Sequence, residues 1–267
     1  MQSEPDKWLT RSIEGARTRA YSLLMLEPSS SGASAECPRC LKPRALCVCS
    51  EMAPVQNRTA VLILQHPQEQ DRTLGTARLA TLQLAHAALK IGLSWPSLAA
   101  ALGRPADPKR WAVIYLGSAA PAELAPGREV LVLDRKGSPL PDQDAALQEI
   151  EGIVLLDGTW SQAKTLWWRN PWVLKAKRIV LNPSRPSRYG LIRREPRRDS
   201  LSTLEATALA LARIENKPEI ETALVASFEQ MLARARSVAL DAEGGNDRRA
   251  RKSRAQRRRR ARAGRRP

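Results

Sequence analysis

The sequence predicts an α/β protein built on a mainly parallel sheet that is covered by helices on both faces. From Thr59 onward, short apolar runs alternate with amphipathic segments, a pattern typical of strands separated by helices. The 267 residues, 43% of them hydrophobic, suffice for one such domain with small appendages. The expected strands are Ala60–Gln65, Ala112–Leu116, Glu129–Leu133, Gly152–Leu156 and Arg178–Leu181. The expected helices are Leu74–Ile91, Asp142–Ile150, Ser161–Arg169, Thr203–Ile214 and Ile220–Leu240.

Composition divides the chain into four parts. We expect a helical extension and linker over 1–35, a cysteine module over 36–58, the α/β domain over 59–240, and an Arg-rich tail over 241–267 that is disordered when free. No apolar run approaches the roughly 18 residues that a membrane-spanning helix needs. The N-terminus does not resemble a signal peptide. We therefore expect a soluble, cytoplasmic protein without membrane association.

The charge of the chain is concentrated at its C-terminus. Residues 248–266 hold 12 Lys and Arg and no acid, so the net charge of +17 falls to +5 for the rest of the chain. A basic body with a more basic tail indicates a polyanionic partner, most often a nucleic acid, bound in a salt-dependent way. The alternative is a tail that only improves solubility. No obligate protein partner is inferred.

The four cysteines lie within thirteen residues, in the spacing C-x2-C-x6-C-x-C. Two close thiolate pairs joined by a short loop can surround a tetrahedral zinc ion. In a cytoplasmic protein this clustering favours a metal over disulfides, although a redox or iron–sulfur role and unliganded cysteines are the alternatives. A site closed by four protein ligands is structural rather than catalytic. The candidate ligands are Cys37, Cys40, Cys47 and Cys49.

A candidate catalytic aspartate follows the fourth expected strand. The strand leads directly into Asp157-Gly158-Thr159-Trp160, and a helix is expected to begin at once. Asp157 would thus lie at the carboxyl edge of the sheet, where α/β enzymes place reactive groups. Asp157 or Thr159 could equally be an ordinary helix N-cap. Four tryptophans follow, which can stack on a base or pack in the core: Trp160, Trp167, Trp168 and Trp172.

The last expected strand is followed by a proline-stiffened basic loop and a well-marked helix start. The arginines Arg185, Arg188, Arg193 and Arg194 are candidates for phosphate contacts, and a solvated loop is the alternative. Next, Ser202 and Glu205 have capping-box spacing ahead of an apolar run. A helix that begins there presents a row of free backbone N–H groups, which could hold a carboxylate.

Four segments in this order resemble the DTW-domain family over about residues 36–240. They are the cysteine block, Leu64-Gln65-His66-Pro67-Gln68-Glu69, Asp157-Gly158-Thr159-Trp160 and Leu201-Ser202-Thr203-Leu204-Glu205-Ala206. Where members often have Asn-Thr-Gly after the His-Pro segment, this chain has Leu74-Gly75-Thr76. The resemblance implies a SPOUT-like fold with a C-terminal trefoil knot. It also implies transfer of the 3-amino-3-carboxypropyl group from S-adenosylmethionine to N3 of a tRNA uridine, which releases 5′-methylthioadenosine.

These expectations give each candidate residue a role. Asp157 would be the general base, and Thr159 would position a base or a cofactor atom. His66 would contact the substrate, or serve as an alternative base. Contacts to S-adenosylmethionine are expected from Leu116, Gly117, Trp160, Ser202, Thr203 and Glu205. The rival functions are a SPOUT-like RNA methyltransferase and a non-catalytic RNA-binding adaptor.

Overall fold

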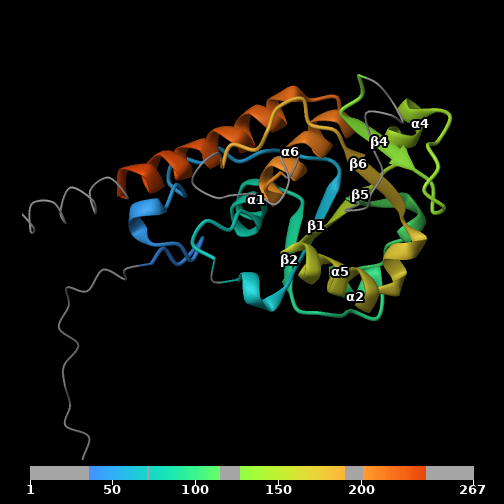
Figure 1. Cartoon of the computed structure of the whole chain (residues 1–267), viewed down its shortest axis with the longest axis horizontal. Helices are drawn as coiled ribbons and strands as arrows, with labels where there is room; N and C mark the ends of the chain where they lie inside the picture. Colours follow the sequence, from blue (N-terminus) through green and yellow to red (C-terminus); the bar gives the residue numbers. More distant parts are fainter. Residues whose placement is uncertain (1–35, 71, 115–126, 190–200, 239–267) are drawn as a thin grey trace, which may run out of the picture. The chain divides into compact units, whose positions relative to one another are not determined.

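Six strands form one sheet in the order β2-β1-β5-β3-β6-β4. All neighbouring strands are parallel except β4, which runs antiparallel to β6. The computed structural model describes residues 36–70, 72–114, 127–189 and 201–238, and Figure 1 shows their arrangement. The strands are β1 (Ala60–Gln65), β2 (Ala87–Ile91), β3 (Trp111–Ile114), β4 (Val130–Leu133), β5 (Gly152–Asp157) and β6 (Lys177–Leu181). The mainly parallel α/β architecture expected from the sequence is confirmed.

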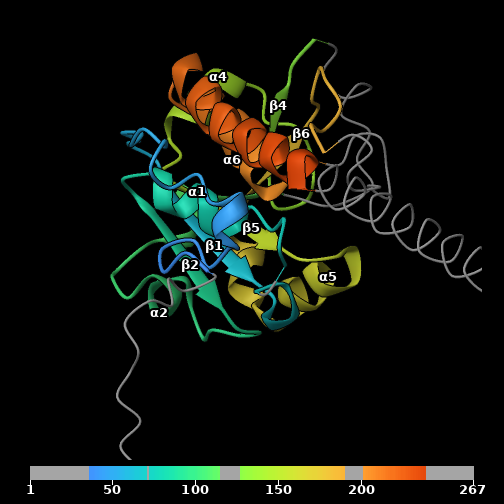
Figure 2. The same cartoon turned by 90° about the vertical axis from the view of Figure 1, so that its left-hand side faces the viewer.

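Helices pack on both faces of this sheet (Figures 1 and 2). The α-helices are α1 (Ala77–Gln83), α2 (Leu98–Leu102), α4 (Gln143–Gln148), α5 (Trp160–Arg169) and α6 (Thr203–Ile214), with a last helix over 218–238. Short 3-10 turns span Arg44–Leu46, Pro67–Glu69, Pro108–Arg110 and Pro171–Lys175. No helix in the described part of the chain has the length and hydrophobicity needed to cross a membrane.

Alternate residues of the central strands enter two separate cores. In β1, Val61 and Ile63 pack with residues of α1 and α6, while Leu62 and Leu64 pack with residues of α2 and α5. All four side chains are buried. A strand covered on both faces has to be apolar at every position, which explains the uninterrupted apolar run of β1.

The expected helix Leu74–Ile91 is wrong. The helix α1 ends at Gln83, and Ala87–Ile91 is instead the edge strand β2, parallel to β1. The chain leaves the helix because residues 83–86 bond to the segment before β1: Val55 N donates to the carbonyl of Gln83 (2.8 Å) and Ala85 N to that of Val55 (3.0 Å). Long-range backbone pairing overrides the local helical preference of this alanine- and leucine-rich stretch.

The other expected elements form, with small shifts at their ends. The strand Ala60–Gln65 and the helix Thr203–Ile214 match their predicted bounds. The helix α2 was not predicted. The chain divides into Met1–Ser34, which lies outside the described residues, and Ala35–Pro267, to which everything below belongs. The expected tail 241–267 also lies outside the described residues.

Candidate active site

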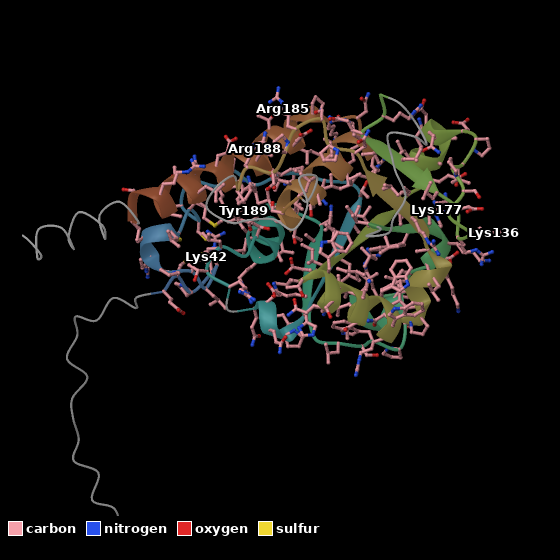
Figure 3. All side chains as sticks on the ribbon, in the orientation of Figure 1. Lys42, Lys136, Lys177, Arg185, Arg188 and Tyr189 are labelled. Atoms are coloured by element: carbon pink, nitrogen blue, oxygen red, sulfur yellow. The ribbon has the colours of Figure 1, made fainter. Side chains whose placement is uncertain are left out.

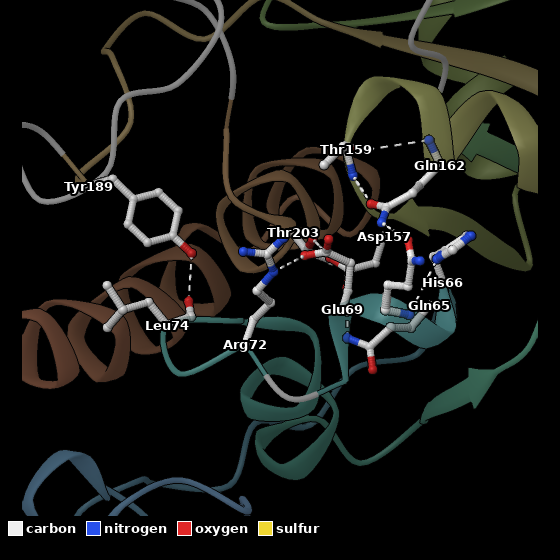
Figure 4. Close-up of polar contacts among 11 residues, drawn as sticks. Gln65, His66, Glu69, Arg72, Leu74, Asp157, Thr159, Gln162, Tyr189 and Thr203 are labelled. Carbon is white, nitrogen blue, oxygen red and sulfur yellow. Dashed lines mark hydrogen bonds and ion pairs between the residues drawn. The ribbon is translucent and has the colours of Figure 1, made fainter.

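The carboxylate of Asp157 is held at the carboxyl end of β5 by two donors from neighbouring elements. Gln65, its register partner at the end of β1, donates from Nε2 to Oδ2 at 2.7 Å. The hydroxyl of Thr203, in the first turn of α6, donates to Oδ1. Gln65 is buried, whereas Asp157 is half-buried. Figure 4 shows this arrangement. Each carboxylate oxygen therefore has a fixed direction while the group stays accessible.

Asp157 lines a pocket instead of packing into the protein interior. The walls come from four further places: the turn after β1, the turn before α1, the segment after β6, and the start of α6. The lining residues are Glu69, Gly75, Thr76, Asp157, Gly158, Tyr189, Leu201, Ser202 and Thr203. The pocket thus lies beyond the carboxyl ends of β1 and β5, the place where parallel sheets bind ligands.

Thr159, and not Asp157, is the N-cap of α5. Its side chain and that of Gln162 form a reciprocal capping box, in which Thr159 N donates to Gln162 Oε1 at 2.6 Å. Position 158 has to be a glycine, because a Cβ at this position would lie only 2.8 Å from Cβ of Gln162. The capping interpretation therefore describes Thr159, and the Asp157 side chain is left for the pocket. The proposed contact of Thr159 with base or cofactor stays a prediction.

The start of α6 has fewer free amides than expected. Ser202 is its N-cap in a capping box with Glu205. The amides of Leu204 and Glu205 are bonded to Thr76 Oγ1 (3.2 Å) and Ser202 Oγ (3.2 Å). The buried Glu205 carboxylate also accepts from Ser187 Oγ at 2.7 Å. Glu205 thus fastens the segment after β6 to α6, and its role in cofactor binding stays a prediction.

The four cysteine sulfurs converge. All four Sγ atoms lie within 4.8 Å of one another, with Cys37 and Cys49 Sγ 3.9 Å apart. Tetrahedral Zn–S bonds of about 2.3 Å place the sulfurs about 3.8 Å apart, so the spacing fits zinc. The amide of Cys40 lowers the pKa of Cys37 to about 6, which favours the metal-binding thiolate. Burial raises the pKa of Cys49, a cost that a bound cation offsets.

The chain is similar to proteins of one known family. The family model described as DTW domain matches residues 34–236.

The chain belongs to the DTW-domain family.

Proteins named tRNA-uridine aminocarboxypropyltransferase 2 are 30% identical to it in Mus musculus (81% of this chain, 69% of that protein) and in Drosophila melanogaster (71% and 70%). An Arabidopsis thaliana protein named tRNA-uridine aminocarboxypropyltransferase A is 26% identical (73% and 79%). No solved structure matches.

The aromatic candidates of this DTW domain divide into core and surface. Trp172 is buried, and its Nε1 donates to the carbonyl of Trp95 at 3.0 Å. Trp160 is half-buried, and Trp167 packs beneath the guanidinium of Arg178, 5.6 Å from the ring centre. Trp168, by contrast, is 73% exposed. Of the four rings, Trp168 is the one most open to a splayed base.

The basic and histidine candidates are spread around the DTW domain. His66 caps the turn after β1, where its Nδ1 accepts from Gln68 N at 3.3 Å, and its amide donates to the carbonyl of Asp157 at 3.0 Å. Arg185 is exposed, whereas Arg188 donates to Glu229 at 2.7 Å (Figure 3). Leu116, Gly117, Arg193 and Arg194 lie outside the described residues.

Three residues of the site were not singled out from the sequence: Lys42, Tyr189 and Glu69. Lys42 lies between the second and third cysteines, and its buried ammonium donates to the carbonyls of Thr73 (2.8 Å) and Gly75 (2.6 Å). Burial lowers the pKa of Lys42 to about 8. Tyr189 OH donates to the carbonyl of Leu74 at 2.7 Å (Figure 4). The cysteine module and the segment after β6 therefore both hold the pocket wall at 73–75.

Glu69 is the other residue that sequence analysis missed. It belongs to the Leu64–Glu69 segment, which served there only as a family signature. The side chain is buried, and Oε2 lies 3.4 Å from Nε of Arg72. Oε1 is buried without a hydrogen-bond partner among the described residues. The only sequence signal for a role of Glu69 was a carboxylate within the Leu64–Glu69 segment. Its burial beside the pocket depends on the turn that begins at Pro67.

Proposed function

We propose that this DTW-domain protein transfers the 3-amino-3-carboxypropyl group of S-adenosylmethionine to N3 of a uridine in tRNA, releasing 5′-methylthioadenosine. The observation that carries the proposal is the Asp157 carboxylate, fixed by Gln65 and Thr203 at the edge of a pocket. Family membership and relatives that are named for this reaction support it.

In this proposal Asp157 is the general base. The N3–H of uridine is a weak acid, so its proton moves to a carboxylate oxygen of Asp157 as N3 attacks. Gln65 and Thr203 each donate to one oxygen, and they keep the remaining lone pairs directed toward the pocket. When bound, S-adenosylmethionine supplies an electrophilic carbon and a sulfonium whose C–S bond breaks with the electron pair going to sulfur. Because the γ-carbon and not the methyl must face N3, orientation decides the product.

The donor is proposed to bind at the carboxyl ends of β1, β3 and β5 and at the start of α6. The pocket beside Asp157 includes Ser202 and Thr203, two of the predicted cofactor contacts. The adjacent strand β3 leads into residues 115–126, which contain Leu116 and Gly117. Trp160 follows the Asp157 turn directly. These positions support a single donor site formed by the segments that follow β3 and β5 and by the start of α6.

A SPOUT-like fold with a C-terminal trefoil knot is also part of the proposal. It is supported by the family membership and by the parallel order β5-β3-β6, with α6 packed against one face of these strands. A knot is a property of the whole chain path. Its threading depends on 115–126 and 190–200, which lie outside the described residues.

We assign a structural zinc ion to Cys37, Cys40, Cys47 and Cys49. The convergence of the four Sγ atoms fits a four-thiolate cation site. Backbone oxygens of the cluster are also bonded: Arg39 donates to the carbonyl of Cys49 at 3.2 Å, and Arg234 of the last helix to that of Cys47. A reducing, cytoplasmic location agrees with four thiols held this way.

The tRNA is proposed to contact the surface that extends from the active site along α5 and β6. Between Asp157 and Glu195 the sequence has nine Lys and Arg and no acid. Exposed members of this run include Lys164, Arg169, Lys175 and Arg185, and the exposed Trp168 lies between Lys164 and Arg169 in the sequence. Cations that contact phosphates beside an aromatic ring that stacks on a base are typical of RNA-binding surfaces.

One experiment distinguishes this function from its two rivals. The purified protein is incubated with unmodified tRNA and S-adenosylmethionine, and the nucleosides are identified by mass spectrometry. A uridine that carries the 3-amino-3-carboxypropyl group supports the proposal. A methylated nucleoside indicates the methyltransferase instead. Unmodified tRNA together with no measurable donor binding indicates the RNA-binding adaptor.

A further inference from the structure

Glu69 lines the pocket beside Asp157 and has one buried carboxylate oxygen without a donor. The residue is 6% exposed, and Oε1 has no hydrogen-bond partner among the described residues. Its Oε2 faces Arg72, whose side chain is 59% exposed. Leaving a buried carboxylate oxygen unpaired is costly. In a residue that lines a pocket, such an oxygen is a candidate for contact with a ligand donor.

The charge of the pocket indicates the sign of that ligand. Glu69 and Asp157 line the same space, and the remaining lining residues are uncharged: Gly75, Thr76, Gly158, Tyr189, Leu201, Ser202 and Thr203. Two carboxylates that face one pocket repel each other unless a cation lies between them. Arg72 pairs only with Oε2 of Glu69, so a positively charged ligand group with an N–H donor would fit the pocket at Oε1.

We propose that Glu69 binds the primary ammonium of the aminocarboxypropyl group of the donor. This inference rests on the proposed function. S-adenosylmethionine offers two cationic centres, the sulfonium and the ammonium. Only the ammonium has N–H groups, and a buried carboxylate oxygen without a donor requires one. Glu69 would thus hold the fragment that is transferred and turn its γ-carbon, instead of the methyl, toward uridine N3.

The test compares Glu69→Gln with the wild-type protein, using two uncharged-sulfur analogues of the donor and isothermal titration. S-adenosylhomocysteine has the ammonium but no sulfonium, whereas 5′-methylthioadenosine lacks both. We expect the substitution to weaken S-adenosylhomocysteine binding by at least about tenfold and to leave 5′-methylthioadenosine binding unchanged. Loss of S-adenosylmethionine affinity without loss of S-adenosylhomocysteine affinity would overturn the ammonium assignment.

Thermal unfolding separates a ligand-binding role from a structural one. Removing a desolvated charge should leave the melting temperature of the ligand-free Glu69→Gln protein equal to or above that of the wild type. A clear decrease would mean that Glu69 supports the fold, and the inference would fail. Glu149→Gln, at an exposed carboxylate of another surface, is the matched control. If the wild type binds neither S-adenosylmethionine nor its analogues, the proposed function fails. If the wild type binds them and Glu69→Gln binds them equally well, only the role of Glu69 in donor binding is excluded.

Discussion

Gln65 and Asp157 are register partners at the ends of the paired strands β1 and β5, and their side chains are hydrogen-bonded at 2.7 Å. Backbone pairing and side-chain pairing therefore coincide at the last position of both strands. Because β1 pairs with β5 up to this last position, we expect the Asp157 backbone to be well fixed. The candidate base is thus positioned by the sheet itself, with Thr203 of α6 adding a second constraint.

Replacing Asp157 by Asn should reduce aminocarboxypropyl transfer by about a hundredfold or more. The amide oxygen can still accept from Gln65, and the amide nitrogen can donate to the hydroxyl of Thr203 once this rotates, but the amide cannot take the proton from uridine N3. The measurement is the single-turnover rate with tRNA, together with tRNA affinity and melting temperature, both of which should remain near wild-type values. Asp144→Asn, at an exposed carboxylate that pairs with Arg128, is the control. Full activity of the Asp157 variant would remove this residue from the mechanism.

Lys42→Met should weaken S-adenosylmethionine binding by about tenfold while the metal content is retained. The methionine fills the volume of the lysine stem but releases the carbonyls of Thr73 and Gly75, and charge-assisted bonds of this kind contribute about 1.5–3 kcal/mol. Titration calorimetry and metal analysis provide the two readouts. Lys109→Met, at an exposed lysine, should behave as wild type. Unchanged donor affinity would show that Lys42 does not support the pocket wall.

Replacing Cys40 by Ser should remove the metal and lower the free energy of unfolding by several kcal/mol. The three remaining thiols cannot complete a closed tetrahedral site, and burial of Cys37 and Cys49 then lacks its compensating cation. Elemental analysis should find one zinc per wild-type chain and little in the variant, and chelation of the wild type should lower its melting temperature similarly. A wild-type protein purified without metal, or with iron, would contradict the zinc assignment.

Trp168→Ala should raise the KM for tRNA by about tenfold and leave kcat unchanged, because stacking on a base contributes about 1–3 kcal/mol. Trp168→Phe should restore part of the affinity, since its ring can still stack. Leu174→Ala removes a partly exposed apolar side chain (41% exposed) and tests whether apolar area alone matters. Steady-state kinetics at several tRNA concentrations make the measurement. An unchanged KM for Trp168→Ala would exclude the ring from the RNA-binding surface.

Deletion of residues 246–267 should weaken tRNA binding and flatten its dependence on salt, since 12 Lys and Arg are lost. Turnover at saturating tRNA should not change, because the active-site residues are retained. Binding isotherms at several salt concentrations give the slope. If the slope is the same with and without the tail, the tail does not contact RNA, and its role is limited to solubility.

Much of the fold follows from local chemistry. The apolar run Ala60–Gln65 is buried on both faces, and the capping box of Ser202 and Glu205 begins α6 where its spacing predicts. The four cysteines converge because short spacings leave few other arrangements for two thiol pairs. Asp157 was placed at a strand end by the apolar run before it. Each of these features depends on residues within a few positions of one another, so the sequence alone was sufficient.

Tertiary structure decided what depends on segments far apart in the chain. Pairing with β1 turned Ala87–Ile91 from an expected helix into a strand. The tertiary fold also brought Lys42 to the carbonyls of Thr73 and Gly75, and it buried one oxygen of the pocket residue Glu69 without a donor. The physical reason is that a buried polar group takes its partners from whichever backbone the fold brings near, and local sequence spacing does not encode that proximity.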